Sequence, residues 1–187
     1  MDPFLLYTCF VEIWGFIIAD SPQDLSNVWL YNPYIIISVT FYCWFLISIA
    51  ILPGQVKRRL YCILFPLGTG VLTAYLIWGN RESLIKPILN IGAFLISLLC
   101  LLFFYTQIKN PACHQSLLRV PGFWMAAGLL IFYTGISLLA SVYDLLEKSS
   151  INIGGSSIQN FITQVLSLFL YTCITIAIIQ CSYPPKT

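Results

Sequence analysis

The chain has 187 residues, of which 59% are hydrophobic and only 9% charged, with a net charge of +2 and a mean hydropathy of +0.87. A soluble domain carries about 25% charged residues. So little charge cannot cover the surface of a water-soluble fold, which excludes that class. Lipid must replace water around the apolar faces, so the backbone polar groups must be satisfied inside helices or a closed barrel.

Long apolar runs decide between these two architectures. Transmembrane strands alternate in polarity over about ten residues, whereas the runs here are continuous and separated by short polar loops. They predict an all-α, polytopic membrane helical bundle of about six transmembrane helices, forming a single transmembrane domain over residues 1–187. The predicted helices span about residues 4–19, 30–52, 60–78, 84–108, 121–143 and 158–181. Most reach the roughly 20 residues that a bilayer requires.

The first apolar run is the shortest and has the length of a signal peptide. A signal peptide begins with basic residues and ends at a small-residue cleavage site. This chain instead begins Met1-Asp2-Pro3 and carries Glu12 within the run. We therefore interpret it as a first transmembrane helix.

The distribution of basic residues predicts the orientation. Six helices leave two alternating sets of loops, and the set that contains both chain ends holds six of the nine Lys and Arg residues. These six are Lys57, Arg58, Arg59, Lys109, Arg119 and Lys186, against Arg81, Lys86 and Lys148 in the other set. Because cytoplasmic loops carry the excess of Lys and Arg, both termini are predicted to be cytoplasmic, in a cell inner membrane or plasma membrane.

The run Lys57-Arg58-Arg59 has two interpretations: contact with anionic lipid headgroups, or docking of a cytoplasmic partner. The basic residues form no dense stripe of the kind that binds nucleic acid.

The seven cysteines contain no C-x-x-C pair, which argues against a disulfide framework and a zinc site. The adjacent pair Cys113-His114 cannot complete a tetrahedral site. We therefore expect neither a metal nor another cofactor.

Glu12 is the clearest ionisable residue inside a predicted membrane helix, and such residues are functional candidates by default. One interpretation is a protonated carboxyl that hydrogen-bonds another helix, with Asn90, Thr163 or Gln164 as its partner. The other is a proton-linked or ligand-binding role. Both remain open from the sequence.

The last predicted helix carries four polar residues at three- and four-residue spacing, which places them on one face. They are Asn160, Thr163, Gln164 and Ser167. This face either forms hydrogen bonds between helices or makes the polar wall of a ligand cavity.

In the third helix, the stretch Pro66 to Gly70 contains a proline and two glycines that permit a kink. No G-x-S-x-G, H-E-x-x-H or Walker loop is present, so we expect no enzymatic activity.

The fifth helix opens with Pro121-Gly122-Phe123-Trp124, followed by Gly128 and Tyr133. With Glu12 in an early helix, this pattern resembles a poorly characterised family of bacterial integral membrane proteins with six or seven helices and a P-x-F-W motif. The polar positions of that family's last helix differ here. Family members often have one more N-terminal helix, so the resemblance implies a seven-helix plan that lacks its first helix. It also implies a role beside a sensor histidine kinase.

Together these features favour an integral membrane sensor or accessory subunit that has no catalytic activity and signals through a partner chain. The short loops leave no soluble domain to carry an output. A small transporter or homo-oligomeric channel is the first alternative, with Glu12, Asn90 and the polar face of the last helix along its path. A membrane-permeabilising effector is the second. In each case the remaining partner is membrane lipid.

Overall fold

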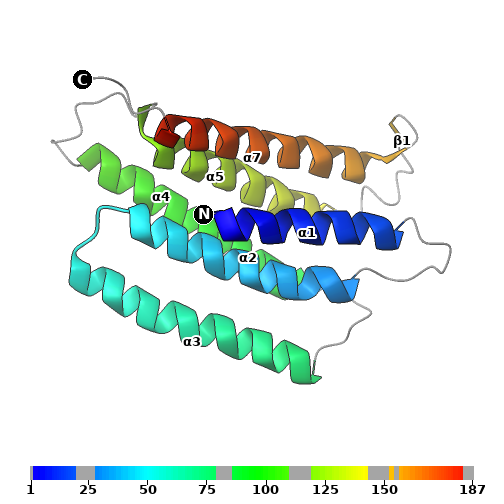
Figure 1. The fold of residues 1–187 in the computed structure, drawn as a ribbon, viewed down its shortest axis with the longest axis horizontal. Coiled ribbons are helices and arrows are strands. Elements are labelled where there is room, and N and C mark those ends of the chain that lie inside the picture. Colours follow the sequence, from blue (N-terminus) through cyan, green and yellow to red (C-terminus); the bar gives the residue numbers. More distant parts are fainter. Residues whose placement is uncertain are drawn as a thin grey trace.

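A computed structural model describes residues 2–19, 28–78, 86–109, 119–142, 152–153 and 156–182. It confirms the all-α bundle, with six helices in these ranges (Figure 1). The helices are α1 (Asp2–Ala19), α2 (Val28–Ile49), α3 (Gly54–Trp78), α4 (Lys86–Lys109), α5 (Pro121–Ser141) and α7 (Ile158–Ser182). Two short strands, β1 (Asn152–Ile153) and β2 (Ser156–Ser157), pair antiparallel just before α7.

Five of these helices are long and apolar enough to cross a membrane, judged by length and composition: α2, α3, α4, α5 and α7. The apolar part of α1 is shorter and covers Phe4–Ile18. The chain is therefore a multi-pass membrane protein. Its large exposed hydrophobic side chains, such as Phe16 at 73% and Leu138 at 70% exposure, suit contact with lipid.

The boundary between α2 and α3 differs from the predicted one. We expected helices over 30–52 and 60–78, whereas α2 ends at Ile49 and α3 already begins at Gly54. Pro53 explains both changes, because a proline disfavours helical geometry in the residue before it and suits a helix start. Its carbonyl accepts hydrogen bonds from the backbone N–H of Val56 and Lys57, at 2.9 and 3.1 Å. Hydropathy could not detect the polar first turn of α3.

The helices run alternately up and down, and each packs on a neighbour in a chain of contacts. α3 packs on α2, α2 on α4, α4 on α5, and α5 on α7, while α1 packs on α2. In Figure 1, α3 lies at the lower edge and α1 lies between α2 and α7. The start of α1 and the end of α7 point to the same end of the bundle (Figure 1).

That end also carries most of the basic residues of the described chain, and we call it the basic end. Lys57, Arg58 and Arg59 lie in the first turns of α3, Lys109 is the last residue of α4, and Arg119 precedes α5. The start of α3, the end of α4 and the start of α5 all lie on the left in Figure 1. The opposite end holds the starts of α2, α4 and α7.

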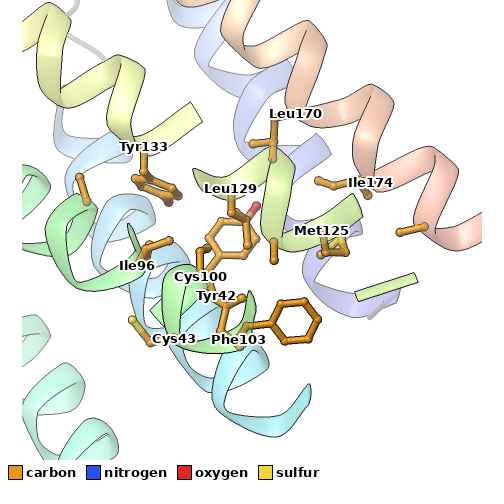
Figure 2. Packing of buried hydrophobic residues seen from close by; sticks show 14 of the residues in the cluster. Tyr42, Cys43, Ile96, Cys100, Phe103, Met125, Leu129, Tyr133, Leu170 and Ile174 are labelled. Atoms are coloured by element: carbon orange, nitrogen blue, oxygen red, sulfur yellow. The ribbon is translucent and has the colours of Figure 1, made fainter. Parts of the chain in front are cut away.

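Buried side chains from α2, α4, α5 and α7, together with Phe4 of α1, form the core, which we call the packed cluster (Figure 2). Its most buried members are at most 1% exposed: Cys43, Leu46, Ala93, Ile96, Cys100, Phe103, Met125, Ala126 and Leu129. Most of these positions lie in the later part of α2 and α4 and the earlier part of α5. The packed cluster therefore lies mainly in the half of the bundle nearer the basic end.

Small residues allow the helices to approach closely, as is common when packing rather than water drives association. A Cβ atom on Gly68 of α3 would lie 2.6 Å from Oγ1 of Thr40 on α2. The P-x-F-W segment has a similar role at the start of α5. Pro121 takes an early helical position, and a Cβ on Gly122 would lie 3.2 Å from the Phe103 ring. This motif therefore builds the contact between α5 and α4.

Candidate ligand cavity

A cavity of about 270 Å³ lies among α1, α2, α4, α5 and α7, in other words every described helix except α3. Its lining residues are Glu12, Tyr31, Tyr34, Ile35, Ser38, Tyr42, Leu89, Phe132, Tyr133, Ile136, Thr163, Ser167, Leu170 and Tyr171. The cavity is thus mainly apolar and aromatic, with one carboxyl group and several hydroxyl groups. Ligand sites commonly combine such a lining with a few placed polar groups.

The cavity occupies the half of the bundle away from the basic end. Tyr31 and Tyr34 lie near the start of α2, Leu89 near the start of α4, and Thr163 near the start of α7. Three lining residues, Tyr42, Tyr133 and Leu170, also belong to the packed cluster. Figure 2 shows them beside the other core side chains. All three are at most 6% exposed, so the cavity is closed on the side of the packed cluster, which we call its inner end.

Glu12 lies at the mouth of the cavity, on a part of α1 that remains exposed. The hydroxyl group of Tyr31 on α2 donates a long hydrogen bond of 3.5 Å to its Oε2 atom. Gly15 makes this contact possible one turn further along α1. A Cβ atom at that position would lie 2.5 Å from the Tyr31 hydroxyl oxygen, so a larger residue would displace the ring.

Five of the lining residues are tyrosines, and four of them form two edge-to-face pairs. The rings of Tyr31 and Tyr34 have centroids 6.4 Å apart at 79°, and those of Tyr42 and Tyr133 are 6.1 Å apart at 72°. This geometry is favourable for aromatic pairs and fixes the orientation of each ring. The cavity therefore has rigid aromatic walls from three different helices.

The structure brings together only some of the residues predicted from the sequence. Glu12 and Thr163 line the same cavity, and Ser167 lies one turn beyond Thr163 on α7. Gln164 is exposed and lies outside the lining, because one residue along a helix rotates the side chain by about 100°. Asn90 is likewise exposed beside the lining residue Leu89. The side chain of Asn160 lies outside the described residues.

The aromatic lining was missed by the sequence analysis. In the sequence, Tyr31 and Tyr34 fit the belt of Tyr and Trp residues at the membrane–water interface as well as they fit a cavity lining, because both lie near the start of a membrane helix. The spacing of Tyr31, Tyr34, Ser38 and Tyr42 by three and four residues was the available signal for one helix face. Tyr133 gave no comparable signal, because α5 contains no other tyrosine.

A buried polar contact between α2 and α3 was also missed. Asn32 is 0% exposed, and its side-chain amide donates a hydrogen bond of 3.2 Å to the Tyr75 hydroxyl. In the sequence, Asn32 followed by Pro33 is typical of a helix start and does not indicate a buried contact. In the structure, Asn32 lies within α2 and ties the edge helix α3 to the bundle.

The basic residues of α3 differ in their surroundings. The Lys57 ammonium donates a 2.7 Å hydrogen bond to the carbonyl of Ser48, and so caps the last turn of α2. Arg58 and Arg59 are exposed and line an open depression with Gln55, Cys62 and Ile63. Of the three, these two arginines are the ones available to a headgroup or a partner.

Within the described residues, no group of three or more His, Cys, Asp or Glu side chains is placed to hold a metal ion. Cys113 and His114 lie outside those residues. No protein-family model, curated protein or solved structure matches the chain. The comparisons therefore identify no family, and the family resemblance of the P-x-F-W segment stays a prediction.

Proposed function

We propose that the chain is a membrane sensor or accessory subunit that has no catalytic activity of its own and signals through a partner chain. The observation that carries this proposal is the cavity lined from five helices, with a carboxyl group at its mouth and a closed inner end. A ligand held there touches almost every helix of the bundle at once.

Such a cavity couples binding to helix arrangement. The described contacts of α1 are mainly with α2, and α1 contributes only Phe4 to the packed cluster, whereas α2, α4, α5 and α7 interlock through it. A ligand that contacts Glu12 on α1 and Thr163 on α7 stabilises one spacing of these two helices over others. A ligand shifts a conformational equilibrium only by its differential affinity for the two states, and this cavity provides that difference.

The closed inner end favours a receptor over a conduit. Between the cavity and the basic end, side chains such as Leu46, Phe103 and Leu129 are at most 1% exposed. A transporter or channel made from a single chain must open this packed cluster to complete a path. The transporter and effector hypotheses therefore require a second conformation or an oligomer, whereas ligand sensing requires neither.

The output of the sensor is assigned to the basic end. The excess of Lys and Arg at this end supports a cytoplasmic location for it, and the cavity then belongs to the outer half of the membrane. Arg58 and Arg59 are exposed there, and an acidic surface on a partner would complement them. The family resemblance suggests a sensor histidine kinase as this partner.

Native mass spectrometry of the gently extracted protein from its own membranes tests the proposal. We expect a complex with a signalling chain that is lost in the double variant Arg58→Glu/Arg59→Glu. The variant Lys109→Glu reverses a charge at the same end but on another helix, and it should keep the complex. A homo-oligomer without a partner, together with ion flux in liposomes, would overturn the sensor assignment in favour of a channel or effector.

A further inference from the structure

We propose that the cavity at Glu12 binds a small organic ammonium cation. This inference names the ligand class of the proposed sensor and in that sense rests on the proposed function. It follows from three properties of the cavity taken together: its charge, its aromatic walls and its size.

The charge of the cavity lining is unbalanced. Among its described lining residues, Glu12 is the single charged group, and none is Lys, Arg or His. Within the described residues, its carboxyl group accepts a hydrogen bond of 3.5 Å from the Tyr31 hydroxyl. Because Glu12 lies within the apolar stretch Phe4–Ile18 of α1, lipid rather than water surrounds that part of the helix, and an ionised carboxyl group there is costly unless an opposite charge accompanies it. A cationic ligand supplies that charge.

The aromatic walls select the type of cation. Five tyrosines and Phe132 line the cavity, and aromatic rings attract organic ammonium groups through their π faces. The tyrosine hydroxyl oxygens also accept hydrogen bonds from any N–H of the ligand. An inorganic cation such as Ca²⁺ needs six to eight oxygen ligands, and one carboxyl group with scattered hydroxyls does not provide this set.

The size of the cavity limits the ligand. Its volume of about 270 Å³ lies just under the 300–1,000 Å³ that is usual for sites of drug-sized molecules. Tyr42 and Tyr133 close its inner end. Apolar lining residues such as Ile35, Leu89 and Ile136 suit short alkyl groups. A tetramethylammonium or choline-sized cation therefore fits better than a long-chain amine.

Isothermal titration of the full chain in a maltoside detergent tests this assignment, because phosphatidylcholine would itself present the ligand group. The probes are choline and its uncharged carbon isostere, 3,3-dimethylbutan-1-ol. We expect saturable binding of choline and at least tenfold weaker binding of the alcohol. The variant Glu12→Gln should also weaken choline binding at least tenfold, which corresponds to about 1.4 kcal/mol.

Matched variants separate the cavity from the rest of the bundle. Tyr171→Phe keeps the ring and should bind choline more tightly than Tyr171→Leu, which removes the ring. Gln164→Ala changes an exposed residue outside the lining and should leave the affinity unchanged. Circular dichroism and thermal unfolding confirm that each variant is folded before its affinity is compared.

Equal binding of choline and its isostere, or an unchanged affinity in Glu12→Gln, would overturn the assignment, as would absence of choline binding by the folded wild-type chain. The two proposals fail separately. If choline does not bind but a signalling chain still depends on Arg58 and Arg59, only the ligand class is wrong. If choline binds and no partner is found, only the sensor role is wrong.

Discussion

The substitution Gly68→Ala tests whether α3 is held to α2 by direct backbone approach. The added Cβ would lie 2.6 Å from Oγ1 and 2.9 Å from Cγ2 of Thr40. Favourable contacts between carbon atoms begin near 3.5 Å. Both branches of Thr40 are in the way, and its hydroxyl is held by a 2.8 Å hydrogen bond to the Ile36 carbonyl, so a rotamer change gives little relief. The two helices must separate locally.

Overpacking of this kind costs about 1–3 kcal/mol. Alanine also favours the helix by about 0.8–1.0 kcal/mol relative to glycine, which offsets part of the loss. Gly70 provides the matched control, because a Cβ there meets nothing within 4 Å. We therefore expect Gly70→Ala to be neutral or stabilising, and Gly68→Ala to be about 1–3 kcal/mol less stable than Gly70→Ala.

Shortening Thr40 should restore the stability that Gly68→Ala loses. In the double variant Gly68→Ala/Thr40→Ala, Oγ1 and Cγ2 of residue 40 are absent, and its Cβ lies at an ordinary 3.4 Å from the added methyl group. Unfolding in mixed detergent micelles, followed by tryptophan fluorescence, measures the stability of the wild type, the two single variants and the double variant. If the effects of Gly68→Ala and Thr40→Ala add to within about 0.5 kcal/mol, the close approach is not real and the reasoning fails.

Three further predictions concern single contacts. Tyr75→Phe should destabilise the protein by about 0.6 and at most about 1.7 kcal/mol in the same unfolding assay, because it removes one interhelical hydrogen bond; no change would contradict that bond. Gly15→Ala should displace Tyr31 and reduce choline affinity severalfold, and an unchanged affinity would separate that ring from the site. Lys57→Met should speed hydrogen exchange of amides in the last turn of α2 by uncapping Ser48, while unaltered exchange would show that the cap contributes nothing.

The helices could be predicted from the sequence because the hydropathy of a membrane span is a sum over its own residues. Each membrane span needs only enough apolar residues in a row, and neighbouring helices do not change that requirement. The boundary near Pro53 was less accessible. Hydropathy ends a span where charge begins, whereas the helix α3 begins at Gly54 and continues through Lys57, Arg58 and Arg59. The backbone hydrogen bonds of a helix do not depend on whether its side chains are polar.

The site could be predicted only in part, because a cavity depends on which faces meet. Glu12 was found because a carboxyl group stands out in an apolar run. The sequence favoured Thr163 and Gln164 equally as site residues, yet of these two only Thr163 lines the cavity. The rotation of α7 against α5 decides this, and it is set by contacts such as that of Gly128 with Cys173. Such packing between two helices cannot be predicted from the sequence of either helix alone.

The packed cluster offers a direct test of receptor against conduit. Leu129 is 0% exposed in the packed cluster, and Leu138 on the same helix is 70% exposed. Leu129→Ala should destabilise the protein by about 2–5 kcal/mol because it leaves a void, whereas Leu138→Ala should cost less than about 0.5 kcal/mol. For a receptor with a closed cavity, neither variant should raise ion flux in liposomes. Flux through Leu129→Ala alone would mean that the packed cluster is a gate, and the transporter hypothesis would then replace the sensor.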